Sequence, residues 1–185
     1  MRLPLLLVAC ALVGCPARSE DGLRPMARPA VRDGGAPDLT DDALAVRLGV
    51  DRSTLRRVVT FAPMDCVLVH ARRQGRWGAW AVDAREAPTG LLGATRVLRA
   101  WARLGHEPFT EDLARVVGLF AFPDDTVIPR RDVVEVDGAP VWAAAPSLAP
   151  DGRGGRALSF TLRSPEGTLR AARFVISADH VVTAR

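Results

Sequence analysis

The sequence contains no lysine, no asparagine and no tyrosine, and isoleucine occurs only at Ile128 and Ile176. The missing residue types have AT-rich codons, whereas the abundant arginine, glycine, alanine and proline have GC-rich ones. A GC-rich genome therefore explains why all 25 basic residues are arginine and why the pI is near 10.0. From Thr40 onward, 20 arginines stand against 17 acidic residues, which is the balance of an ordinary solvated surface. The high pI is therefore no argument for binding to nucleic acid.

Residues that carry out chemistry are also scarce. The three cysteines are Cys10, Cys15 and Cys66, and the three histidines are His70, His106 and His180. Their scattered positions match no zinc-binding spacing. The sequence has no phosphate loop, dinucleotide fingerprint or nucleophile elbow. We therefore expect a protein that is not an enzyme and that has neither a metal nor a cofactor.

The first fifteen residues have the pattern of a secretory signal. Arg2 gives a positive start, and the apolar run from Leu3 to Gly14 is broken only by Pro4. A membrane-spanning helix needs about 20 apolar residues, so this run is too short to cross a bilayer. A charged start, a run of this length and small residues at its end predict a signal peptide over residues 1–14.

The run ends in Leu12-Val13-Gly14-Cys15, which resembles the lipobox of bacterial lipoproteins. In that family the cysteine becomes the first mature residue and carries acyl chains, so the resemblance implies lipidation of Cys15. The segment Leu7-Val8-Ala9-Cys10 is a second candidate, but it leaves an apolar run of only seven residues. Two or more acyl chains anchor a protein stably. The implied location is the inner or outer membrane of the cell envelope, with the domain facing the periplasm or the exterior.

A linker is predicted after the lipidated cysteine. The segment from Pro16 to Leu39 is rich in proline and glycine, and its four arginines balance four acids. It has too few large apolar side chains to offset the entropy lost on ordering. As a coil, its 24 residues would span on the order of 25–30 Å. We therefore predict a lipidated cysteine and flexible linker over residues 15–39, and one globular domain over residues 40–185.

Two short helices are predicted at the start of this domain. Thr40 can cap the first helix, Gly49 ends it, and Asp51 can cap the second. The stretch from Leu44 to Val58 resembles a helix-turn-helix, with the glycine in its turn. The resemblance implies five side chains that would face DNA, namely Arg52, Ser53, Thr54, Arg56 and Arg57.

The context of this stretch favours a different interpretation. A lipoprotein outside the cytoplasm meets no operator DNA, and a helix-turn-helix needs at least a third helix to close its core. Here a linker precedes the stretch and strand-like sequence follows it. A two-helix corner packed on a sheet accounts for the same pattern. A DNA-binding regulator stays the alternative if the N-terminus is not a working signal.

Two apolar segments, the first partly β-branched, predict a β-hairpin from Met64 to Ala84 that turns at Gln74-Gly75. Cys66 and His70 suggest a nucleophile and its base, but on one strand they would stand about 13 Å apart. We therefore expect Cys66 to be a small core residue.

Helical spacing predicts two further helices between Pro88 and Phe120. The apolar positions of the first are Leu91, Leu92, Val97, Leu98, Trp101 and Leu104. It ends at Gly105, and the second helix begins at Thr110. The apolar positions of the second are Leu113, Val116, Val117 and Phe120. A basic stripe on the first helix consists of Arg96, Arg99 and Arg103, which we expect to be solvated or to touch an acidic partner or lipid headgroups.

The remaining chain, from Thr126 to Arg185, reads as strands. Its clearest element is a hairpin around Asp137-Gly138, a turn sequence that accepts positive φ. Further strands follow at residues 158–162, 169–176 and 181–184. The predicted fold is α+β, with an antiparallel sheet of about five or more strands and helices packed on one face.

These patterns together predict a membrane-anchored lipoprotein of the cell envelope. Its domain would be a non-enzymatic protein-binding or assembly accessory module. The expected partners are the membrane, through acyl chains on Cys15, and an envelope protein, with no nucleic acid. An unrecognised envelope hydrolase is a third hypothesis, because residues scattered in sequence can still meet in a fold.

Overall fold

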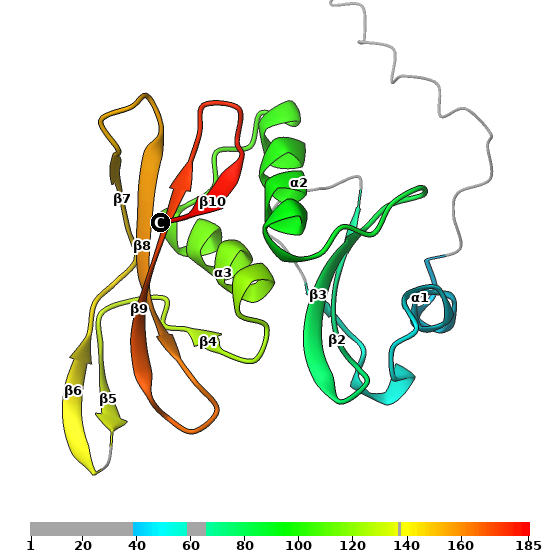
Figure 1. Ribbon diagram of the computed structural model, residues 1–185, viewed down its shortest axis with the longest axis horizontal. Coiled ribbons are helices and arrows are strands. Elements are labelled where there is room, and N and C mark those ends of the chain that lie inside the picture. Colours follow the sequence, from blue (N-terminus) through cyan, green and yellow to red (C-terminus); the bar gives the residue numbers. More distant parts are fainter. Residues whose placement is uncertain (1–38, 59–65, 137) are drawn as a thin grey trace, which may run out of the picture. The chain divides into compact units, whose positions relative to one another are not determined.

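The computed structural model describes residues 39–58, 66–136 and 138–185. The helical elements in these ranges are α1 (Asp41–Leu48), α2 (Gly90–Arg103), α3 (Thr110–Ala121) and a 3₁₀ turn, η1 (Arg52–Thr54). The first strands are β1 (Arg56–Val58), β2 (Val67–Arg73), β3 (Arg76–Val82), β4 (Thr126–Val127) and β5 (Asp132–Val136). The later strands are β6 (Ala139–Ala143), β7 (Ser147–Pro150), β8 (Arg156–Arg163), β9 (Leu169–Ile176) and β10 (Val182–Ala184). Figure 1 labels most of these elements along the chain.

Helix α1 begins and ends as the sequence predicts. The Thr40 hydroxyl accepts a hydrogen bond from the Ala43 backbone N–H at 3.3 Å. Gly49 follows the last helical residue in the left-handed conformation, with φ of 61°. Glycine adopts this conformation without the steric cost that other residues incur, so it ends the helix.

The predicted second helix after Asp51 is wrong. Asp51 does cap the segment, because its carboxylate accepts the Ser53 backbone N–H at 2.9 Å. The cap starts only the 3₁₀ turn η1, however, and the chain then extends into β1, whose Arg57 pairs with Val69 of β2. A valine pair begins at Val58, and β-branched side chains favour strands over helices. Pairing with the edge of β2 therefore replaces the second helix.

The predicted hairpin is confirmed as β2 and β3. Its turn residues, Gln74 and Gly75, both have positive φ, at 52° and 80°. This is the type I′ geometry that matches the twist of two-residue hairpins. The register pairs Arg73 with Arg76 at the turn.

Both faces of this hairpin are covered. On one face, Leu68 and Ala81 belong to the larger apolar core, which includes residues of α2 and α3. On the other face, Val69, Trp80 and Val82 form a smaller core with the side chains of α1. The hairpin therefore separates two cores, and burial on both sides explains its nearly continuous apolar sequence.

Helices α2 and α3 contact both the β1–β2–β3 sheet and the second, larger sheet (Figure 1). The predicted stripe of α3 is confirmed, since Leu113, Val116, Val117 and Phe120 are all buried. In α2, Leu92 and Leu104 do not join the apolar face, with exposed fractions of 75% and 53%. Leu104 lies just beyond the last helical residue, where the chain leaves the helical path.

The larger sheet runs in the order β10-β9-β8-β4, and β7 also pairs with β8. All of its pairings are antiparallel. Leu158, Phe160 and Leu162 of β8 lie in the core with the helices. The fold is therefore α+β with antiparallel sheets, as the sequence predicts.

Strands β5 and β6 pair only with each other among the described strands, so they do not join the larger antiparallel sheet. Pro129 precedes this hairpin and Pro146 follows it. Proline lacks the N–H that a strand ladder needs and constrains the residue before it, which explains the breaks. Strand β7, which the sequence analysis did not identify, ends in Pro150 at a sheet edge where proline is tolerated.

Candidate functional site

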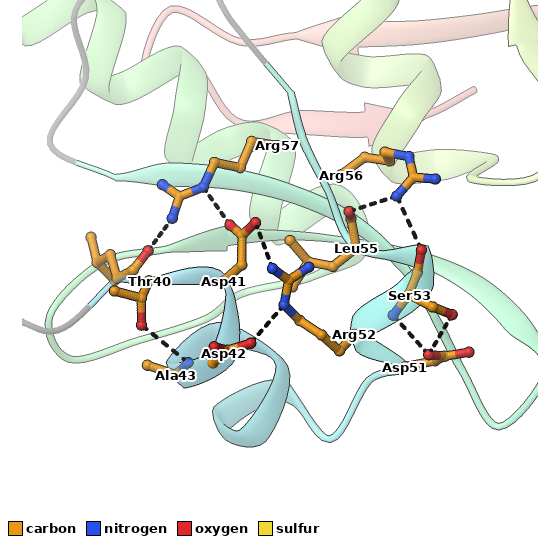
Figure 2. Close-up of polar contacts among 11 residues, drawn as sticks. Thr40, Asp41, Asp42, Ala43, Asp51, Arg52, Ser53, Leu55, Arg56 and Arg57 are labelled. Carbon is orange, nitrogen blue, oxygen red and sulfur yellow. Dashed lines mark hydrogen bonds and ion pairs between the residues drawn. The ribbon is translucent and has the colours of Figure 1, made fainter.

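The residues predicted to face DNA lie in η1 and β1, and Figure 2 shows four of them, Arg52, Ser53, Arg56 and Arg57, at the corner with α1. Arg52 forms ion pairs with Asp42 at 2.8 Å and with Asp41 at 3.3 Å. Arg57 binds the second oxygen of Asp41 at 2.7 Å. Two of the predicted arginines therefore pair with the acidic first turn of α1. The hydrogen bond and charge of Arg57 also hold the pKa of Asp41 below its ordinary value.

The other predicted residues are engaged in the same corner. The Ser53 hydroxyl donates to the Asp51 carboxylate at 2.7 Å, which lowers the pKa of Asp51. The Thr54 hydroxyl accepts the Arg72 backbone N–H at 2.9 Å and so joins η1 to β2. The Arg56 guanidinium donates to the backbone carbonyl of Ser53 at 3.1 Å.

This network stabilises the corner locally, and it offers no recognition helix. Reading DNA through a helix-turn-helix requires a second helix in the major groove. Residues 52–54 form a single 3₁₀ turn and residues 56–58 form a strand, so that helix is absent from this part of the described chain. The geometry therefore favours a structural role for these side chains.

The basic stripe of α2 is not simply solvated. Arg96 forms an ion pair with Asp83, and Arg99 donates to the backbone carbonyl of Asp179 at 3.1 Å. These contacts tie α2 to the end of β3 and to the turn between β9 and β10. The stripe therefore helps to hold the fold together.

Asp83 is a buried acceptor at the centre of several contacts. Burial alone would raise its pKa, but hydrogen bonds from the backbone N–H groups of Glu86 and Arg85 lower it. The positive charges of Arg96 and Arg47 lower it further, and the net shift of the Asp83 pKa is downward. Arg47 also donates to the Asp83 backbone carbonyl at 2.6 Å, which links α1 to the same point.

Cys66 and His70 do not form a nucleophile and base. Cys66 is a buried thiol within the larger core. The His70 Nε2 donates to the Pro123 carbonyl at 2.8 Å, and its ring stacks on Trp77 with centroids 4.4 Å apart. Among the described residues, no three histidine, cysteine, aspartate or glutamate side chains come together as a metal site.

The hairpin of β5 and β6 carries the clearest exposed apolar side chains on neighbouring strands. The exposed fractions are 45% for Val133, 39% for Val141 and 65% for Trp142. We call Val133 and Trp142 the hairpin patch, whereas Val141 pairs with Val134 and therefore lies on the opposite face of the hairpin. Val133 pairs with Trp142 across the hairpin, and the Arg131 guanidinium lies 4.9 Å from the centre of the Trp142 ring. The sequence predicts this hairpin but not the exposure of its side chains. The prolines that flank the hairpin, Pro129 and Pro146, are the sequence features that could have indicated this exposure.

The predicted lipidation site, Cys15, lies outside the described residues, as does the whole segment that resembles a lipobox. No helix in the described ranges is both long enough and apolar enough to cross a membrane. No family model matches the sequence, and comparison with curated proteins and with solved structures finds no similar protein.

Proposed function

We propose that this chain is a lipid-anchored lipoprotein of the cell envelope whose domain binds another envelope protein through the hairpin patch. The lipobox ending in Cys15 supports the anchor, and the composition of residues 16–39 supports a tether. The binding role is inferred from the exposure of Trp142 beside Val133, on a hairpin with which no other described strand pairs. The role is non-enzymatic binding or assembly.

The hairpin patch has the chemistry of a protein-binding site. Clustered apolar side chains at a surface mark interaction sites more often than isolated ones do. Tryptophan is among the residues that contribute most to binding energy at interfaces. Arg131 holds a positive charge against the Trp142 ring. The matching partner is therefore a protein with an apolar pocket and carboxylates at its rim.

The edges of the hairpin indicate how a partner would approach. Pro140 lies in β6, where it removes an N–H from that strand. Proline is one of the devices that prevent strand addition at an edge. Side chains of the patch, rather than new backbone pairing along β6, are therefore expected to make the contact.

Replacement of Cys15 with alanine should abolish incorporation of radiolabelled palmitate and release the protein from the membrane fraction. The reason is that the lipobox cysteine would carry the acyl chains, and without them no second anchor is predicted. Measurement in the native host should compare this variant with wild type. The matched control is Cys10→Ala, which should keep the label. Absence of label in wild type, with protein in the cytosol, would reject the anchor.

A photo-crosslinking amino acid at Val133 should give one discrete adduct with an envelope protein in the native host. The Trp142→Ala change should weaken affinity for that purified protein at least tenfold, an effect of about 1.4 kcal/mol that is expected for a central aromatic contact. The matched control is the same crosslinker at Val46, which is 84% exposed on α1.

Three results would contradict binding through the hairpin patch. The first is the same adduct from Val46. The second is an adduct that persists with unchanged affinity in Trp142→Ala. The third is an adduct of the chain with itself, which would show self-association in place of a separate partner.

A further inference from the structure

The end of α2 folds back in a way that positions two aromatic rings. Gly105 has φ of 66°, its N–H donates to the Ala102 carbonyl at 3.1 Å, and the His106 N–H donates to the Trp101 carbonyl at 2.9 Å. These paired bonds form a Schellman motif, in which the residue after the glycine packs on the last helical turn. The His106 ring accordingly lies edge-on to the Trp101 ring, with centroids 5.5 Å apart.

A turn from the other side of the domain is fixed next to these rings. The Val182 backbone N–H donates to the buried Thr95 hydroxyl at 3.0 Å. Arg99, one turn further along α2, donates to the Asp179 carbonyl at 3.1 Å. These bonds hold the β9–β10 turn on α2 and bring His180, with its positive φ of 62°, towards the end of the helix.

Between these elements lies a cavity of about 110 Å³. Trp101, His106, His180 and Arg156 are among its polar lining residues. Leu98 and Leu113 are among its apolar ones. Bulk water occupies about 30 Å³ per molecule, so the cavity has room for a ligand of a few heavy atoms.

Two side chains that line the cavity each contain a buried nitrogen with no hydrogen-bond partner among the described residues. These nitrogens are Nε1 of Trp101 and Nε2 of His106. The Trp101 side chain as a whole is 1% exposed. Buried polar groups are nearly always hydrogen-bonded, because leaving one unpaired costs about 1–3 kcal/mol. Two such nitrogens in residues that line one cavity point to a ligand-binding site.

We propose that this cavity binds a small monocarboxylate with a short apolar tail. The indole N–H of Trp101 can only donate, and the Arg156 guanidinium likewise carries only donors. Donors of this kind suit a carboxylate. The leucine side chains of the cavity suit the apolar tail.

Glu107 also lines the cavity and sets the charge that the ligand can carry. Its carboxylate repels a second negative charge, whereas Arg156 attracts the first. A dianion such as phosphate is therefore disfavoured, and a neutral amide lacks the charge that Arg156 would bind.

The test is a titration of the ¹⁵N-labelled full chain, in non-ionic detergent, with butyrate, butyramide and inorganic phosphate. The chain has four tryptophans, so four indole N–H signals can be followed and assigned through Trp101→Phe and Trp142→Phe. Butyrate should shift the Trp101 signal and leave the Trp142 signal unchanged, with a Kd on the order of 1 mM.

Variants locate the charge that binds the carboxylate. Arg156→Gln should weaken butyrate binding about tenfold, because it removes a charge-assisted hydrogen bond. The matched control is Arg163→Gln, at the opposite end of β8, which should change the Kd less than twofold. His106→Gln should also weaken binding, and the dispersion of the other indole signals reports whether each variant folds.

Three outcomes would overturn the proposal. A Trp101 signal that does not move with butyrate would mean that water alone satisfies the two nitrogens. Equal binding of butyramide would show that the site does not require a carboxylate. Tighter binding of phosphate would show that the site requires neither a single negative charge nor an apolar tail. Because the hairpin patch takes no part in this test, either proposal can fail without the other.

Discussion

Replacing Trp101 with alanine is expected to lower the free energy of unfolding by about 3–5 kcal/mol, the range for an aromatic residue lost from a core. Trp101 is 1% exposed and packs in the larger core with residues of both sheets. Its removal leaves a cavity that rigid neighbours cannot fill, so the lost contacts are not replaced. Small domains are stable by only about 5–15 kcal/mol, and this change alone would bring the protein close to unfolding.

The measurement is urea denaturation followed by circular dichroism, because the far-ultraviolet signal comes mainly from the peptide backbone rather than from indole rings. The matched control is Trp142→Ala, the same substitution at a side chain that is 65% exposed. It should change the free energy of unfolding by less than about 0.5 kcal/mol, as is usual for surface positions. Similar losses in both variants would show that Trp101 is not a central core residue.

The Asp83→Ala change is expected to cost about 2–4 kcal/mol of unfolding free energy. It removes an acceptor of the Arg85 and Glu86 N–H groups together with the ion pair to Arg96. Charge-assisted hydrogen bonds contribute more than neutral ones, and breaking a buried pair leaves its other charge unpaired. The matched control is Asp42→Ala, since Asp42 is also bound by an arginine but its side chain is 87% exposed. Asp42→Ala should stay close to wild type.

The Asp83 contribution should also depend on pH in a defined direction. The folded-state pKa of Asp83 lies below its ordinary value of 3.8. The stabilisation is therefore complete above that ordinary value and is lost as the pH falls through the folded pKa. The difference in unfolding free energy between wild type and Asp83→Ala should be constant from pH 7 to about pH 5 and shrink below about pH 4. A difference that grows on acidification would contradict the lowered pKa.

The parts of the fold that could be predicted from sequence depend on one or two local residues. Thr40 and Gly49 fix the ends of α1 through a side-chain cap and a positive φ, and both are visible in sequence. The Gln74-Gly75 turn fixes β2 against β3 in the same local way. The second helix, which was predicted wrongly, shows where prediction from local residues ends. Asp51 caps a helical turn as predicted, but pairing of the following residues with β2 replaces the rest of the helix.

The environment of the candidate site residues could not be predicted. The resemblance to a helix-turn-helix implies that Arg52 and Arg57 face DNA, but they pair with acids 10 to 16 residues earlier in the chain. The cavity beside Trp101 has no local signal in the sequence, because Arg156 reaches it from β8 and His180 from the β9–β10 turn. Such sites depend on tertiary contacts, which no short pattern in the sequence records.

Because both faces of the β2–β3 hairpin are covered, the chain cannot be shortened past α1 without exposing an apolar sheet face. Val69, Trp80 and Val82 are covered by α1, with Leu39 packed at the margin of the same cluster. A chain that began after Gly49 would keep the larger core but would present this apolar sheet face to solvent. Exposed faces of this kind promote aggregation. The eight residues of α1 are therefore required for solubility, although most of the buried apolar side chains lie elsewhere.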